Sequence, residues 1–142
     1  MRFQTRVDID AEPNAVWQAL IDVESWPKWT ASMTSVERLQ SGPLGVGSSA
    51  RVVQPLLKPA VYTVTACEPG ASFDWQTQLP GLTVSATHHL EALNAARTRL
   101  TLGVTQSGPL SLLAWPLFGQ RTRRYVTMEA EGLKRAAESR ST

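Results

Sequence analysis

The stretch that decides the fold runs from Ala11 to Trp29 and reads AEPNAVWQALIDVESWPKW. Pro13 stands where the first turn of a helix tolerates proline, because its missing N–H would have no partner there. Apolar residues then recur at the spacings of a helix with one buried face, namely Val16, Trp17, Ala19, Leu20 and Ile21. Pro27 stops any helix from running through Trp26, since the residue before a proline disfavours helical geometry. The stretch therefore predicts a short helix and then a second short turn that carries Trp26 and Trp29.

Alternating apolar and polar residues predict strands on both sides of this stretch. Before it, residues 3–10 place Phe3, Thr5, Val7 and Ile9 on one face. After it, six segments with strand character follow one another at about hairpin distance: residues 32–40, 48–54, 60–68, 72–79, 82–93 and 97–106. Such spacing is typical of an antiparallel meander. We therefore expect one strongly curved antiparallel sheet of about seven strands.

A long helix is expected from residue 110 to about Ser139. Six apolar positions mostly keep helical spacing: Leu110, Leu113, Leu117, Tyr125, Met128 and Leu133. Pro116 predicts a kink or the separation of the first turn. Since no other predicted element is long enough, this helix is expected to cover the apolar face of the sheet.

The bulk composition describes a single globular domain spanning residues 1–142. The chain is 42% hydrophobic, and its net charge of +2 says little about partners. With Cys67 as the single cysteine, no internal disulfide can form, which fits a reducing compartment and predicts a cytoplasmic location. The apolar run Leu110–Phe118 is far shorter than the roughly 20 residues that span a bilayer. We therefore expect no stable membrane insertion.

Residues in the first stretch resemble the START-like superfamily of helix-grip proteins, also called SRPBCC proteins, and most of all its polyketide cyclase/dehydrase branch. The positions that carry the resemblance are Pro13, Val16, Trp17, Leu20, Asp22, Trp26, Pro27 and Trp29. Further matches are the Gly45–Gly47 turn before a strand and the segment 131–135 near the end of the long helix. The resemblance implies an α+β fold in which the curved sheet wraps the C-terminal helix and leaves a cavity between them. These motifs are structural, so the resemblance carries over no catalytic residue.

Aromatic and polar side chains on the expected inner faces are the candidates for lining such a cavity, because small-ligand pockets are mostly apolar with a few polar groups. The candidate ligand-binding residues are Trp29, Met33, Gln54, Tyr62, Phe73, Trp75, Thr77, His88 and Trp115. The alternative for each aromatic residue is ordinary core packing. Trp17 is interpreted as structural, packing the first helix under the sheet.

His88 is the one candidate for acid–base chemistry. It shares a strand face with Val84, Ala86 and Leu90 and should look inward, whereas His89 points to the opposite face. The alternative is a core histidine whose ring is satisfied by a neighbouring hydroxyl or carbonyl. Because the two histidines diverge and one cysteine lies elsewhere, we expect no metal site. We also expect no cofactor.

Three classes of function stay open. The first is binding, for transport or sequestration, of a small hydrophobic molecule such as a lipid, isoprenoid or polyketide-like compound. The second is a metal-free enzyme of the aromatase/cyclase or dehydratase type that uses the same cavity. The third is a module that docks on a protein or membrane through Leu110–Phe118, a segment that could also gate the cavity.

Two further expectations concern partners. Arg121, Arg123 and Arg124 fit a solvated helix face whose stems cover apolar surface, so nucleic-acid binding is not expected. The chain is expected to be a monomer or a homodimer.

Overall fold

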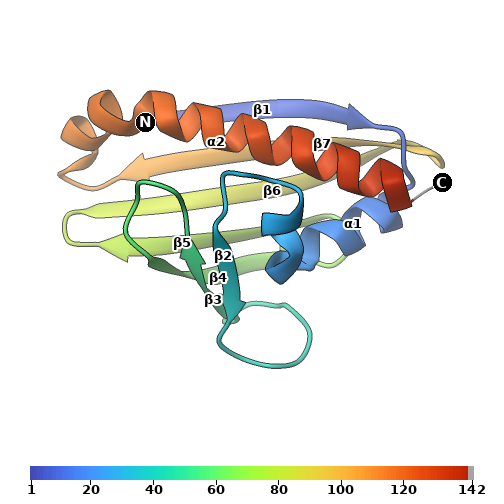
Figure 1. Cartoon of the computed structure of the whole chain (residues 1–142), viewed down its shortest axis with the longest axis horizontal. Helices are drawn as coiled ribbons and strands as arrows, with labels where there is room; N and C mark the ends of the chain where they lie inside the picture. The colour runs from blue at the N-terminus through green and yellow to red at the C-terminus, as the bar shows by residue number, and fades with distance from the viewer. Residues whose placement is uncertain (141–142) are drawn as a thin grey trace.

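The structure, a computed structural model, describes residues 1–140, which form two α-helices, one 3-10 helix and seven strands (Figure 1). In chain order these are β1 (Arg2–Ile9), α1 (Pro13–Ile21), η1 (Val23–Lys28), β2 (Ser35–Arg38), β3 (Ser49–Val53), β4 (Ala60–Glu68), β5 (Ser72–Leu79), β6 (Leu82–Asn94), β7 (Arg97–Ser107) and α2 (Ser111–Arg140). The predicted α+β architecture is confirmed.

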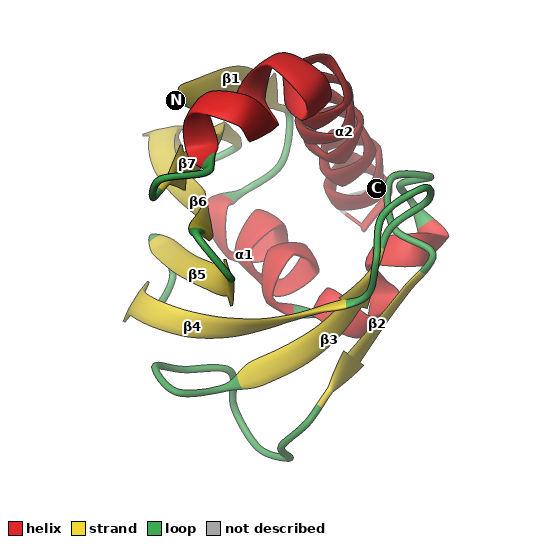
Figure 2. Ribbon diagram, turned by 90° about the vertical axis from the view of Figure 1, so that its left-hand side faces the viewer, coloured by secondary structure: helices red, strands yellow, loops and turns green. Residues whose placement is uncertain are grey.

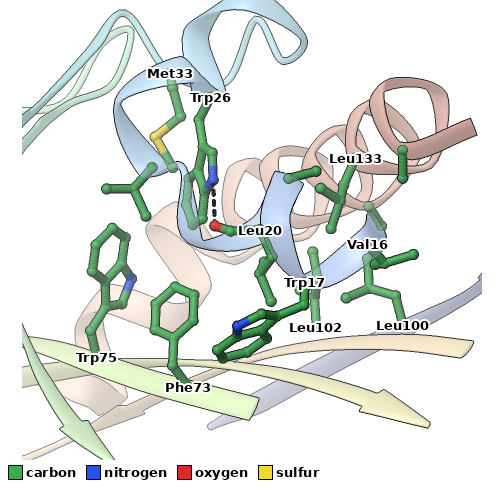
Figure 3. Close-up of a cluster of buried hydrophobic side chains, with 14 of the residues drawn as sticks. Val16, Trp17, Leu20, Trp26, Met33, Phe73, Trp75, Leu100, Leu102 and Leu133 are labelled. Carbon is green, nitrogen blue, oxygen red and sulfur yellow. Dashed lines mark hydrogen bonds between the residues drawn. The ribbon is translucent and has the colours of Figure 1, made fainter. Parts of the chain in front are cut away.

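The stretch that opens the sequence analysis forms α1 and η1 as predicted. Pro13 stands at the start of α1, whose buried residues are Val16, Trp17, Ala19 and Leu20. Pro27 lies inside η1, which buries Val23 and Trp26. Trp26 donates its Nε1–H to the Leu20 carbonyl at 3.0 Å, so the end of α1 holds this indole in place (Figure 3). Trp17 packs in the core with 7% of its surface exposed, in agreement with its interpretation as structural.

The seven strands form one antiparallel sheet in the order β1-β7-β6-β5-β4-β3-β2. Strands β2 to β7 are the predicted meander, and β1 closes one edge by pairing with β7. The strand expected at residues 32–40 is shorter, since β2 covers only Ser35–Arg38. Before it, Thr30 Oγ1 accepts the Ser32 N–H at 3.2 Å and lies 2.8 Å from Ser32 Oγ. Side-chain bonds of this kind stabilise a turn in place of a strand.

The sheet curves around the two helices, which pack on its concave side (Figure 2). In β5 the inward residues are those that the alternation predicts, since Phe73, Trp75 and Thr77 are buried. In β4 a register shift between Val64 and Ala66 breaks the alternation, so that Ala66 is exposed and Cys67 packs against the core. In Figure 3, the aromatic rings of β5 meet Trp26 and Leu20 from η1 and α1, and Leu133 approaches from α2. The core therefore lies between the sheet, α1 and the second half of α2.

The first turns of α2 run at an angle to the rest of the helix, in agreement with the kink predicted at Pro116 (Figure 2). The apolar stripe read from the sequence is only partly right, because Leu110, Leu113 and Leu117 are 45%, 65% and 75% exposed. Mostly small residues form the buried face instead: Ser111, Ala114, Gly119, Val126, Ala130, Gly132, Leu133 and Ala137. The reason is close approach: a Cβ on Gly132 would stand 2.7 Å from Trp29 Cε3. Among residues 1–140, no helix has the length and apolar character needed to cross a membrane.

Candidate functional site

A cavity of about 450 Å³ lies between the concave face of the sheet and α2. Its volume falls in the range of about 300–1,000 Å³ that is usual for small-molecule sites. Six of the nine residues predicted from the sequence line it: Met33, Gln54, Tyr62, Trp75, Thr77 and His88. They come from β4, β5, β6 and the segments flanking β2 and β3, so the fold brings them together from distant parts of the chain.

The other three predicted residues lie elsewhere. Trp29 lines a separate small void of about 10 Å³. Phe73 is fully buried behind His88, whose ring stacks on it at a centroid distance of 4.2 Å. Trp115 is partly exposed on the first part of α2, with the Arg123 guanidinium 5.8 Å from its ring. None of these three side chains lines the main cavity.

Trp26 is a lining residue that was absent from the sequence-based candidates. Only 2% of its surface is exposed, and its ring lies 5.3 Å from Trp75 and 5.6 Å from His88, measured between centroids. Tyr62 extends this cluster, with its ring centroid 5.4 Å from that of Trp75. The inner end of the cavity is therefore built from aromatic rings in tilted and edge-on contact, an arrangement that aromatic pairs favour.

His88 presents a neutral imidazole to this aromatic end. Its Nδ1 lies 2.9 Å from the Phe73 carbonyl oxygen, which can only accept, so Nδ1 carries the proton and Nε2 is left as an acceptor. No partner for Nε2 is found among the described residues. Burial lowers the pKa of His88 to about 4, against the smaller raising effect of the hydrogen bond to Phe73. The ring therefore stays neutral at pH 7.

Glu129 is a second lining residue that the sequence-based prediction missed. Glu129 lines both the cavity and the small void, and His88 and Trp26 also line both. Ser32 donates a long hydrogen bond of 3.4 Å from Oγ to Glu129 Oε1, and within residues 1–140 no Lys or Arg pairs with it. Burial raises the pKa of Glu129 to about 8, with the bond from Ser32 acting in the opposite direction. At pH 7 this group is thus mostly a neutral acid that can donate a hydrogen bond.

Other polar groups complete the lining. Burial, and to a lesser degree the negative charge of Glu129, raise the pKa of Tyr62 far above its usual value, so its hydroxyl stays protonated. Gln106 lines the cavity, and its buried Oε1 has no hydrogen-bond partner in the described chain. Gln54 donates its Nε2–H to the Ser32 carbonyl at 3.3 Å. Gln54, Tyr62, His88 and Gln106 are therefore uncharged at neutral pH and Glu129 mostly so, and apolar residues with a few threonines make up most of the remaining inner surface.

The opening of the cavity is bounded by the first half of α2, the loop between β3 and β4, and the turn between β5 and β6. Tyr125 of α2 donates its hydroxyl hydrogen to the Pro55 carbonyl at 2.7 Å, which ties the loop to the helix. The Leu110 N–H donates to the Gly81 carbonyl at 2.8 Å, which ties the turn to the start of α2. Lys58 and Arg121 also belong to the lining. Charged groups with long side chains therefore stand at the opening and a carboxyl group at the inner end.

The chemistry available at this site is hydrogen bonding and proton transfer within an apolar enclosure. Among residues 1–140, no three or more His, Cys, Asp or Glu side chains gather as metal ligands would. His88 Nε2 can accept a proton or hydrogen bond, and Glu129 and Tyr62 can donate one. The site can therefore hold an apolar molecule and fix the position of one or two of its polar atoms.

Comparison with known proteins places this geometry in context. The family model described as polyketide cyclase/dehydrase and lipid transport matches residues 1–138. No curated protein matches the sequence. Among solved structures, the Zhui aromatase/cyclase from Streptomyces sp. R1128 is similar with a TM-score of 0.82 and 18% identity, over 100% of this chain and 96% of that chain.

Two other solved structures show the same likeness. The protein TTHA0849 from Thermus thermophilus has a TM-score of 0.79 at 15% identity, over 100% of both chains. A START superfamily protein from Mycobacterium smegmatis has a TM-score of 0.70 at 15% identity, over 99% of this chain and 96% of that chain. At such low identities, these likenesses establish the shared fold alone.

Proposed function

The chain belongs to the polyketide cyclase/dehydrase and lipid transport family, and from this premise we propose that it binds a small hydrophobic ligand, such as a lipid, isoprenoid or polyketide-like compound, in its internal cavity. The observation that carries the proposal is the unfilled space of about 450 Å³ beneath α2. Protein interiors are otherwise packed to the density of organic crystals. An apolar cavity of this size costs stability unless a ligand fills it.

The lining indicates how such a ligand is oriented. Its apolar part contacts Trp26, Trp75 and the aliphatic residues of β6 and β7, which replaces water against these side chains. Its polar atoms meet the neutral groups at the inner end, of which Glu129 and Tyr62 donate and His88 accepts. A ligand with one oxygen-bearing end and an otherwise apolar body satisfies both regions.

A pair of substitutions on one strand tests this proposal. Ala86 lines the cavity on β6, whereas Ala92 lies on the exposed end of the same strand. Ala86→Phe should fill part of the cavity and weaken binding of a fluorescent apolar probe by about tenfold or more. Ala92→Phe adds the same ring outside the cavity and should bind as the wild type does. Equal binding by all three proteins would mean that the probe does not enter the cavity.

A second candidate function is proton-transfer catalysis on a bound ketone, of the aromatase/cyclase or dehydratase kind. It is favoured by one observation: His88 and Glu129 line the same small void beside the cavity, one as a neutral base and the other as a neutral acid. A carbonyl oxygen hydrogen-bonded by Glu129 would acidify the neighbouring carbon, and His88 Nε2 would accept the released proton. At pH 7 both side chains are already in the protonation state that this reaction needs, with His88 neutral and Glu129 mostly protonated.

Deuterium exchange distinguishes catalysis from simple binding. Apolar ketones that bind the protein are incubated with it in D₂O, and label at the carbon next to the carbonyl is followed by mass spectrometry. Catalysis predicts faster exchange that is lost in His88→Ala and in Glu129→Gln while ligand affinity is kept. A wild-type protein that binds such ketones without accelerating exchange would leave binding as the function.

A further inference from the structure

Exposed leucines lie on the segments that bound the opening of the cavity. Leu56 on the β3–β4 loop is 82% exposed, and Leu112 and Leu117 on the first turns of α2 are 70% and 75% exposed. Leu57 and Leu79 add further apolar surface on the loop and at the end of β5. We call this surface the mouth patch. Clustered apolar side chains of this kind mark an interaction site, whereas isolated exposed ones need no explanation.

The mouth patch is continuous with the cavity. Leu56, Leu79 and Phe118 each expose a large part of their surface to solvent and also line the cavity. Figure 2 views the molecule from the end at which α2 begins. A hydrophobic molecule that enters or leaves the cavity therefore passes directly over the apolar side chains of the patch.

Charge is distributed unevenly about this opening. The segments 54–66, 79–88 and 108–128 contain Lys58, Arg121, Arg123 and Arg124 and no Asp or Glu. Within the described chain, none of these four cations forms an ion pair. Two of them lie near aromatic rings: Arg121 is 5.9 Å from the Phe118 ring centroid, and Arg123 is 5.9 Å from that of Phe3 and 5.8 Å from that of Trp115. A surface with exposed leucines and unpaired cations is complementary to a surface that carries negative charge on its outside and has an apolar layer beneath it.

The other end of the molecule has the opposite character. There, Arg97 pairs with Asp10, Arg99 with Asp8 and Arg140 with Asp22. Figure 1 shows the end of β1 and the end of α2 together at the side of the molecule away from the start of α2. These three arginines are neutralised within the protein, whereas Lys58, Arg121, Arg123 and Arg124 have no carboxylate partner among the described residues.

We propose that the mouth patch docks this protein on an anionic lipid bilayer, with the opening of the cavity against the lipid. The leucines enter the boundary between headgroups and acyl chains, and the arginine side chains extend their guanidinium groups to the lipid phosphates. A hydrophobic ligand then moves between bilayer and cavity without crossing water. A second copy of the chain is a poor occupant, because a two-fold contact through the patch would place four unpaired cations against four others.

Vesicle flotation with the full chain tests the docking. Vesicles of phosphatidylcholine are compared with vesicles in which part of it is replaced by phosphatidylglycerol, with no other ligand added. The protein should float with the anionic vesicles, remain mostly free with the neutral ones, and dissociate at high salt, since salt screens exposed charges. Equal binding to both vesicle types, or to neither, would overturn the proposal even if the cavity binds its ligand.

Matched variants locate the surface responsible. The double variant Leu112→Ser, Leu117→Ser should lower partitioning to anionic vesicles by about tenfold. Val46 on the β2–β3 connection is 69% exposed, much as the two leucines are. Val46→Ser should therefore leave the partitioning unchanged. All three positions are exposed, so these variants should fold like the wild type.

The charge contribution and the competing occupant are tested separately. Arg121→Gln combined with Arg124→Gln should reduce binding and its salt dependence, whereas Arg51→Gln, on the exposed side of β3, should not. Loss of binding in the Val46 or Arg51 control to the same extent would contradict the assignment. So would a dimer, seen by analytical ultracentrifugation, that dissociates in the Leu112, Leu117 double variant, because a second copy would then occupy the patch.

Discussion

Replacing Glu129 by glutamine should stabilise this protein, and by an amount that grows with pH. The carboxyl group is enclosed among Trp26, Trp29 and Leu133, and no cation pairs with it among residues 1–140. Its pKa is raised from 4.5 to about 8, mainly by burial. Because the folded state holds this proton more tightly than the unfolded chain, the folded state loses stability as pH rises from 4.5 to 8 and no further above it.

The size of the effect follows from the pKa values. Between pH 4.5 and 8 the unfolded chain has lost the proton and the folded chain keeps it, so stability falls by about 1.4 kcal/mol per pH unit. Part of Glu129 is open to the cavity, and water there reduces the cost, so the full difference is at most about 5 kcal/mol. His88, whose folded pKa is about 4 against 6.5, acts oppositely from pH 4 to 6.5 and contributes nothing new above it. The clean window is therefore pH 6.5 to 8.

Urea unfolding, followed by tryptophan fluorescence at several pH values, measures this difference. From pH 6.5 to 8, wild-type stability should fall by about 2 kcal/mol, whereas that of Glu129→Gln should stay nearly constant. Glu131→Gln is the matched control, since Glu131 is exposed on the same helix. A Glu129→Gln effect that does not change with pH, or one shared by Glu131→Gln, would refute the assignment of Glu129 as a buried neutral acid.

Two further substitutions test the framework that holds the site. Gly132→Ala should lower the free energy of unfolding by about 2–4 kcal/mol, because the new Cβ overlaps the backbone and ring of Trp29. Gly45→Ala is the control: a Cβ there has no neighbour within 4 Å, so the same urea titration should show a far smaller loss of stability. Trp26→Phe should cost about 1–3 kcal/mol by leaving the Leu20 carbonyl unpaired in the core, and an unchanged denaturation midpoint would contradict this.

The sheet and the inward position of His88 could be predicted because strands alternate with a period of two, and the alternation holds through β5 and through β6 as far as Ala92. Strand ends were less predictable. At Ser32, hydroxyl groups compete with the backbone for hydrogen bonds, and β2 begins three residues later than the pattern indicates. Ser and Thr favour such local hydrogen bonds. The sequence shows that these residues are present, but not whether a side-chain hydroxyl or a neighbouring strand takes the backbone N–H.

The first half of α2 could not be read from its apolar residues alone. Leu113 and Leu117 keep helical spacing, yet they face solvent. Spacing alone could not show this, because apolar residues on an exposed helix face recur at the same intervals as those that pack in a core. Glu129 was overlooked for the converse reason, since a charged residue on a helix is usually solvated. Its spacing of four from both Tyr125 and Leu133 was the available signal, because that places it on one helix face with two apolar residues.

The central claim is that the space beneath α2 is a ligand site, and native mass spectrometry tests it most directly. Delipidated wild-type protein, Ala86→Phe and Ala92→Phe are each incubated with a panel of lipids, isoprenoids and polyketide-like compounds. We expect an adduct of one ligand per chain that is kept in Ala92→Phe and lost in Ala86→Phe. Absence of any saturable adduct, or an adduct that Ala86→Phe leaves unchanged, would contradict the claim.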